Sequence, residues 1–211
     1  MSLDNIGRSE VMEYVKKRVE EFERLGKEGR TVFNFRPFLD LKLKANVKTE
    51  LAFCISTANS SALSGLKFQK SLEDLNLDNL SVDEIEGLMR SAGVRFARRK
   101  AYYVKEALER FEIIERALSM NDFEARKTLL KIKGFGMKES SHFLRNLGRK
   151  NVAIVDRHVL RWLSEKGYSF KLPRDYVKAE LALSVIAEGM GLTLAELDLL
   201  IWFEMTGKVL K

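Results

Sequence analysis

Hydrophobic residues recur every three or four positions along most of this chain, which is the spacing expected of α-helices that bury one face. The first such segment places Val11, Val15, Val19 and Phe22 on one side and is predicted to end near Gly26. Almost every segment long enough to interpret shows helical spacing rather than the strict alternation typical of strands. The pattern therefore predicts an all-α fold.

One stretch near the N-terminus departs from this spacing. Residues 31–39 alternate in part between apolar and polar side chains and include Pro37, so they are predicted to run extended across the surface. A second helix is predicted to begin near Lys48 and to lead into a polar loop at 57–61. A polar loop inside an otherwise apolar region is unusual and marks this segment as a candidate for function.

Helix start and stop signals divide the rest of the chain. Ser81 with Glu84, and Thr193 with Glu196, form capping-box patterns, and Gly93 is placed to close the first of these helices in a left-handed conformation. Other helices are predicted over 96–118, 122–132, 137–147, 157–166 and 194–205.

Composition sets limits on the fold and on its partners. A chain of 211 residues that is 45% hydrophobic suffices for one large domain or two small lobes with a shared core. The formal charge of +7 would attract a polyanion, although it fits a basic protein without such a partner equally well. The single cysteine, Cys54, excludes an internal disulfide and an iron-sulfur cluster held by four thiolates of this chain.

Two glycines one residue apart, Gly134 and Gly136, separate two predicted helices. Glycine permits a tight turn and a close approach of the backbone to another molecule. Amides at the start of the second helix would suit a phosphate group, and contacts of that kind hold DNA without reading its sequence. An ordinary glycine-rich turn between helices is the alternative.

Lys138 and Asp156 are the candidate reactive groups. Lys138 falls in the first helical turn, where a cation faces the unfavourable end of the helix dipole but an amine lone pair is more easily freed for attack. A lysine that contacts phosphate is the alternative. Asp156 follows an apolar strip and fits an N-cap, yet its carboxylate could also stabilise positive charge on a sugar and help deprotonate a nucleophile.

The sequence Ile-Lys-Gly-Phe-Gly-Met-Lys at 132–138, followed by Val-Asp-Arg-His at 155–158, resembles the signature of the helix-hairpin-helix DNA glycosylase superfamily. The resemblance implies two helical lobes with the helix-hairpin-helix motif at the cleft between them. A six-helix lobe would span 47–127. Residues 1–46 with 128–211 would form the second lobe, which carries the motif at about 122–147 and the catalytic aspartate.

The same resemblance assigns roles to single residues. Lys138 implies a bifunctional enzyme, in which the amine attacks the sugar C1′, displaces the base and forms a Schiff base that permits β-elimination. Asp156 would assist it. His158 is similar to a histidine that contacts phosphate together with the glycine turn, although a surface imidazole is the alternative. Asn59 lies where related enzymes fill the gap left in the duplex, but asparagine is also a routine loop residue.

The last ten residues, 202–211, resemble the tail of type 2, archaeal-type 8-oxoguanine DNA glycosylases, which end in lysine. This implies that the terminal carboxylate of Lys211 reaches the base pocket. There it would favour 8-oxoguanine, whose N7 donates a hydrogen bond, over guanine, whose N7 accepts one. A frayed basic tail is the alternative. Trp202 could stack on the extruded base, or belong to the core.

These inferences imply a monomer that binds double-stranded DNA containing 8-oxoguanine, with no membrane partner and a cytoplasmic, nucleoid-associated location. No cofactor is required, and no metal is expected on side chains. The superfamily often binds K⁺ or Na⁺ through hairpin carbonyls, which here would belong to Leu130, Ile132 and Phe135. Two alternatives stay open: a glycosylase for another oxidised base, and a non-catalytic helix-hairpin-helix DNA-binding module.

Overall fold

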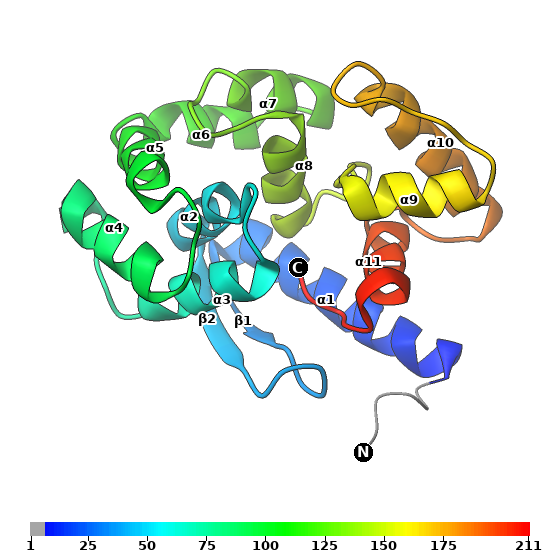
Figure 1. Ribbon diagram of the computed structural model, residues 1–211, viewed down its shortest axis with the longest axis horizontal. Coiled ribbons are helices and arrows are strands. Elements are labelled where there is room, and N and C mark those ends of the chain that lie inside the picture. The colour runs from blue at the N-terminus through cyan, green and yellow to red at the C-terminus, as the bar shows by residue number, and fades with distance from the viewer. Residues whose placement is uncertain (1–6) are drawn as a thin grey trace.

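The helical spacing of the sequence is realised throughout the computed structural model, which describes residues 7–211 (Figure 1). This part of the chain forms eleven α-helices and one small sheet, so the all-α prediction is confirmed apart from two short strands. The helices are α1 (Arg8–Glu28), α2 (Val47–Thr57), α3 (Ala62–Ser71), α4 (Val82–Ser91), α5 (Ala97–Glu109), α6 (Phe111–Leu118), α7 (Asp122–Leu129), α8 (Met137–Asn146), α9 (Arg157–Glu165), α10 (Tyr176–Gly189) and α11 (Leu194–Thr206).

The sheet corrects the prediction for the N-terminal region. β1 (Arg30–Asn34) pairs antiparallel with β2 (Lys42–Asn46), and Phe33 lies opposite Leu43 in the register. The extended conformation is confirmed, but the predicted surface location is wrong, because Phe33 and Phe35 are fully buried. Alternation along β1 turns one face to the core, and this face receives the aromatic side chains.

Several helix boundaries also differ from those predicted. The helix predicted over 96–118 is two helices, α5 and α6, that break at Arg110. Apolar spacing continues across the break and neither glycine nor proline marks it, so the sequence gives no local sign of it. Helix α7 ends at Leu129 rather than at 132, because the hairpin takes up the following residues.

Two capping signals were read correctly. Ser81 and Thr193 each accept a hydrogen bond from the backbone amide three residues on, and the carboxylates of Glu84 and Glu196 accept one from the backbone amide of the cap residue. The first helix continues two residues past Gly26 and is closed by Gly29 with a φ of 70°. Within α1, Gly26 packs directly against the carbonyl of Leu147, which leaves no room for a side chain.

Helix α8 occupies the middle of the molecule, where it packs against α1, α2 and α7 (Figure 1). Helix α11 packs against α1, α9 and α10, and it leads the chain back towards the centre. A large apolar core joins α1, the sheet and α2 through α8, and a smaller one joins α9, α10 and α11. The division into lobes at 47–127 stays a prediction. Within residues 7–211, none of the helices is both long and apolar enough to cross a membrane.

Candidate active site

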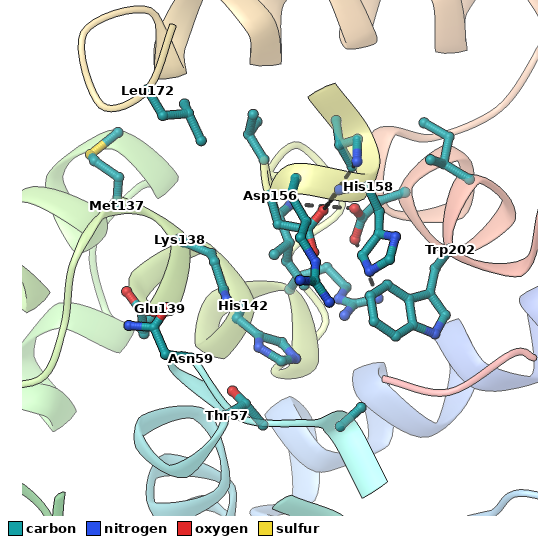
Figure 2. Close-up of a pocket in the computed structure, with 18 of the residues that line it drawn as sticks. Thr57, Asn59, Met137, Lys138, Glu139, His142, Asp156, His158, Leu172 and Trp202 are labelled. Atoms are coloured by element: carbon teal, nitrogen blue, oxygen red, sulfur yellow. Dashed lines mark hydrogen bonds and ion pairs between the residues drawn. The ribbon is translucent and has the colours of Figure 1, made fainter. Parts of the chain in front are cut away.

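A cavity of about 920 Å³ lies between α8, the start of α9 and α11 (Figure 2). It brings together six residues singled out from the sequence, which are Asn59, Lys138, Asp156, His158, Trp202 and Lys211. Gly134 and Gly136, by contrast, do not line it. The hairpin therefore borders the site from outside, and the reactive groups face the cavity itself.

Lys138 enters this cavity from the first turn of α8. The helix begins at Gly136, whose amide donates to Glu139 Oε2 at 3.2 Å. The half-buried Lys138 side chain points from α8 towards the side of the cavity that holds Asp156 (Figure 2). The glycine turn thus ends two residues before the candidate nucleophile and sets the direction in which it projects.

Asp156 is the N-cap of α9. Its Oδ1 accepts hydrogen bonds from His158 N at 2.8 Å and Val159 N at 3.0 Å. The strip before it is tied to α10, since Val155 N donates to Tyr176 Oη and Ala153 N to Glu180 Oε1, both at 3.1 Å. The N-cap interpretation is therefore correct, and it coexists with a place on the cavity wall: capping uses Oδ1 and leaves Oδ2 for a ligand.

His158 and Trp202 lie next to each other on the wall of the cavity (Figure 2). Their rings meet edge to face, with centroids 5.1 Å apart and an interplanar angle of 76°. Trp202 is half-buried at the cavity edge rather than enclosed in the core, and its indole Nε1 has no hydrogen-bond partner. The Trp202 ring thus lines the cavity that also holds the candidate reactive groups.

The end of the chain returns to this site. Val209, Leu210 and Lys211 are all buried, so the alternative of a frayed tail is wrong. Lys211 lines the cavity together with His142, whose two ring nitrogens are buried and have no hydrogen-bond partner.

Among the residues of the cavity wall that the sequence analysis did not single out are His142, Arg145 and Asp198. Burial, reinforced by the positive charges of Arg145 and Lys138, holds the pKa of His142 well below its usual value, so the ring is neutral. His142 lies four residues after Lys138 on α8, and Asp198 four residues before Trp202 on α11. Residues four positions apart share one face of a helix, so the positions of Lys138 and Trp202 could have been used to identify His142 and Asp198.

Asp198 lies next to the strip that carries Asp156. Its Oδ1 accepts from Ile154 N at 3.4 Å, and its Oδ2 lies 3.4 Å from Arg145 Nη1. Burial, opposed by the charge of Arg145 and reinforced by that of Asp156, raises the pKa of Asp198 to about 7. The carboxyl group of Asp198, with a pKa near neutrality, thus lies beside the strip that carries Asp156.

The loop that carries Asn59 is exposed but firmly held. Asn59 adopts a left-handed conformation with a φ of 53°. The next residue, Ser60, accepts from Arg95 N at 2.8 Å and from Lys100 Nζ at 3.0 Å. Lys100 also donates to Ser56 O at 2.7 Å, and its burial lowers its pKa to about 8. The loop therefore has a fixed position at the cavity edge.

The hairpin itself requires glycine at one position. Gly134 has a φ of 90°, and a Cβ there would lie 3.0 Å from the ring of Tyr103. Phe135 N donates to Ile132 O at 3.1 Å, which closes the turn. Within residues 7–211, no group of three or more His, Cys, Asp or Glu side chains is placed to hold a metal ion.

Comparison with known proteins relates this arrangement to one family. Residues 15–192 match the family model described as 8-oxoguanine DNA glycosylase. An 8-oxoguanine DNA glycosylase/AP lyase of Aquifex aeolicus is 46% identical over 214 residues, which cover 96% of this chain and 95% of the relative.

Solved structures agree with the sequence relatives. The 8-oxoguanine glycosylase/lyase of Methanocaldococcus jannaschii, in complex with a 15mer DNA containing 8-oxoguanine, superposes with a TM-score of 0.82 at 36% identity and covers 99% of this chain and 97% of its own. The 8-oxoguanine DNA glycosylase of Thermotoga maritima gives a TM-score of 0.82 at 32% identity, covering 99% and 96%. This chain belongs to the 8-oxoguanine DNA glycosylase family.

Proposed function

We propose that the protein is a bifunctional DNA glycosylase/AP lyase that removes 8-oxoguanine from double-stranded DNA. The observation that carries the proposal is that Lys138 and Asp156 line one cavity, next to the aromatic face of Trp202. The names of its relatives and the 8-oxoguanine DNA bound to the M. jannaschii enzyme support the same reaction. A non-catalytic DNA-binding module would need neither the lysine nor the aspartate.

In the proposed reaction the uncharged amine of Lys138 forms a bond to C1′ while the N-glycosidic bond breaks and its electron pair leaves with the base. The carboxylate of Asp156 stabilises the positive charge that develops on the sugar and takes up a proton from the amine. Ring opening then gives a Schiff base, and loss of a C2′ proton expels the 3′ phosphate oxygen. The capping bonds to Oδ1 keep Asp156 oriented throughout.

The base must leave the stack to reach Lys138, at a cost of a few kcal/mol. We propose that Trp202 stacks on the extruded base and that the carboxylate of Lys211 recognises it. Lys211 is buried and lines the same cavity as Trp202 and His142, which supports this place for the carboxylate. A carboxylate accepts the N7–H of 8-oxoguanine but opposes the lone pair of guanine N7.

Contacts to the DNA backbone are assigned to the border of the cavity. The amides of Gly134 and Gly136 and the imidazole of His158 are proposed to bind phosphates, and Asn59 to fill the gap in the duplex. The strained, firmly held Asn59 loop supports that role. The charge of +7 favours DNA through long-range attraction.

We extend the proposal to the surroundings of the enzyme. It works as a monomer in the cytoplasm, associated with the nucleoid, and requires no cofactor for catalysis. Carbonyls of Leu130, Ile132 and Phe135 bind K⁺ or Na⁺. The turn bond to Ile132 O occupies one of two lone pairs on that oxygen and leaves the other for a cation.

Borohydride reduction tests the reaction directly. With an 8-oxoguanine duplex the native chain should form a covalent adduct, and Lys138→Gln should form none while it still binds the duplex. The same assay over duplexes that each carry one oxidised purine or pyrimidine identifies the preferred lesion. A native chain that forms no adduct with any lesion would contradict the proposal.

A further inference from the structure

The side chain of Lys211 lies in a closed cage. Its Nζ is 2.5 Å from both Glu50 Oε2 and Gln69 Oε1, and 4.2 Å from the ring centres of Phe33 and Phe53. The side chains of Lys211 and Glu50 are each 0% exposed. An ammonium group has three donors, and here two oxygen atoms and two aromatic faces surround it.

Three helices hold Glu50 in place. It lies in the first turn of α2, where the helix dipole favours a carboxylate. It accepts from Gln69 Nε2 of α3 at 2.9 Å and from Asn146 Nδ2 of α8 at 2.6 Å. Because α8 also carries Lys138, the ammonium of Lys211 is held at a fixed position relative to the candidate nucleophile.

Stability alone does not require this ion pair. Burial lowers the pKa of Lys211, and the charge of Glu50 opposes that effect. Buried ion pairs are weak stabilisers, and apolar side chains of similar volume often replace them without loss. What the pair does achieve is geometric, since it fixes the side chain of a residue that also lines the cavity.

We propose that Glu50 is a positioning residue for base recognition: by holding Lys211 Nζ, it fixes the main-chain carboxylate of Lys211 where the extruded base is read. The inference rests on the proposed function. Glu50 itself is fully buried and lies outside the cavity lining, so its side chain has no surface with which to contact DNA. Removing its charge therefore affects recognition of the base and spares the amine chemistry of Lys138.

A comparison of two substrates separates the effect on base recognition from the effect on the amine chemistry of Lys138. An 8-oxoguanine duplex requires the base pocket and Lys138, whereas a duplex with a preformed abasic site requires Lys138 but no recognition of a base. Glu50→Gln keeps the shape of the side chain and removes its charge. The ratio of 8-oxoguanine excision to abasic-site cleavage should fall about tenfold or more, as expected when a recognition group is misplaced. Abasic-site cleavage should stay within about twofold of native.

A second variant, Lys211→Met, removes the ammonium from the other side and should lower the ratio in the same way, even if Glu50→Gln does not fold. The double variant should be no worse than the poorer single variant, because both changes act on one contact. As a matched control, Glu21→Gln removes the carboxylate of another buried ion pair, with Arg18, outside the cavity. It should lower the melting temperature and leave the ratio unchanged.

The outcomes are distinct. Equal loss on both substrates, or an unchanged ratio in Glu50→Gln and Lys211→Met, would overturn the positioning role. A native chain that cleaves abasic sites but does not excise 8-oxoguanine would instead contradict the proposed function.

Discussion

Asp156 shows how one side chain can serve the fold and the reaction together. Its Oδ1 satisfies two amides at the start of α9, as an N-cap does, while the carboxylate lines the cavity opposite Lys138. The structural requirement is for an oxygen acceptor, which asparagine supplies as well as aspartate. The proposed chemical requirement is for a negative charge. A single substitution can therefore separate the two.

Asp156→Asn should retain the melting temperature to within a few degrees, because the cap is preserved. Excision of 8-oxoguanine should fall by roughly a hundredfold or more, the usual contribution of a positioned acid or base. Thermal unfolding and single-turnover excision on the same preparation would measure both. Native excision rates in this variant would leave Asp156 with the capping role alone.

Asp198 makes stability depend on pH. Burial raises its pKa from 3.8 to about 7, so the folded state binds this proton more tightly than the unfolded chain does. The resulting stabilisation is complete below about pH 4 and is lost as the pH rises through 7. Asp198→Asn does not titrate, so its free energy of unfolding relative to native should increase between pH 4 and pH 8. At about 1.4 kcal/mol per pKa unit the change amounts to a few kcal/mol.

Urea unfolding of native and Asp198→Asn protein at several pH values would measure that difference. The part of this difference that is the same at every pH includes the loss of the Arg145 partner and does not affect the test. Only the change of the difference with pH reports the titration of Asp198. A difference that does not vary with pH would mean that Asp198 keeps an ordinary carboxyl pKa in the folded protein.

The sequence was informative about residues whose type is unusual for their position, and less so about the rest. Lys138 at a helix start and Asp156 before a helix could be identified one by one. His142, Arg145 and Asp198 belong to the same cavity wall, but the sequence relates them to it only through helical spacing from Lys138 and Trp202. The packing of α8 and α11 against their neighbours brings these three side chains to one cavity.

At the scale of elements, helices with a clear apolar face or a recognisable N-cap, such as α1, α4 and α9, were located well, whereas α3 and α10 were not predicted. α10 was not predicted, because Val177, Leu181 and Val185 are 49%, 60% and 68% exposed and blur the apolar stripe. β2 was missed because a five-residue strand with three polar positions carries little signal. The break between α5 and α6 likewise depends on tertiary packing.

The hairpin element makes a prediction about its own geometry. Gly134→Ala should destabilise the protein by about 1–3 kcal/mol, because a φ of 90° is unfavourable for alanine and the new Cβ would meet Tyr103. DNA binding should weaken as well, since the amides of the turn would move. Gly189→Ala in α10, where a Cβ meets nothing within 4 Å, is the matched control. It should be neutral or slightly stabilising in chemical denaturation.

Weakened binding without loss of stability in Gly134→Ala would show that the turn adapts to alanine. Loss of stability with unchanged DNA affinity would remove the hairpin amides from the proposed phosphate contacts. Binding should be measured on a duplex without a lesion, so that base recognition does not enter the comparison.

At the scale of the whole molecule, residues far apart in sequence meet at the cavity. Glu50 and Lys211 are 161 residues apart, and Phe33 of the N-terminal sheet also contacts the Lys211 ammonium. Contacts over such distances leave no periodic trace, so the sequence pointed to Lys211 only through family resemblance. The cage explains why β1, α2, α3 and α8 must all be in place before the base pocket is complete (Figure 1).

Because Lys211 is enclosed in this cage, we expect residues added after it to disturb the base pocket. One or more residues after Lys211 would replace its carboxylate by a neutral amide and add atoms to a region where Val209, Leu210 and Lys211 are buried. Excision of 8-oxoguanine should therefore fall strongly in an extended chain, while binding to an undamaged duplex changes little, because that binding depends on backbone contacts. Excision assays with zero, one and three added alanines, beside binding titrations at one salt concentration, would measure this. If excision survived all extensions, the acceptor for N7–H would have to be another group of the cavity wall, and Asp198 would be the first carboxylate to test.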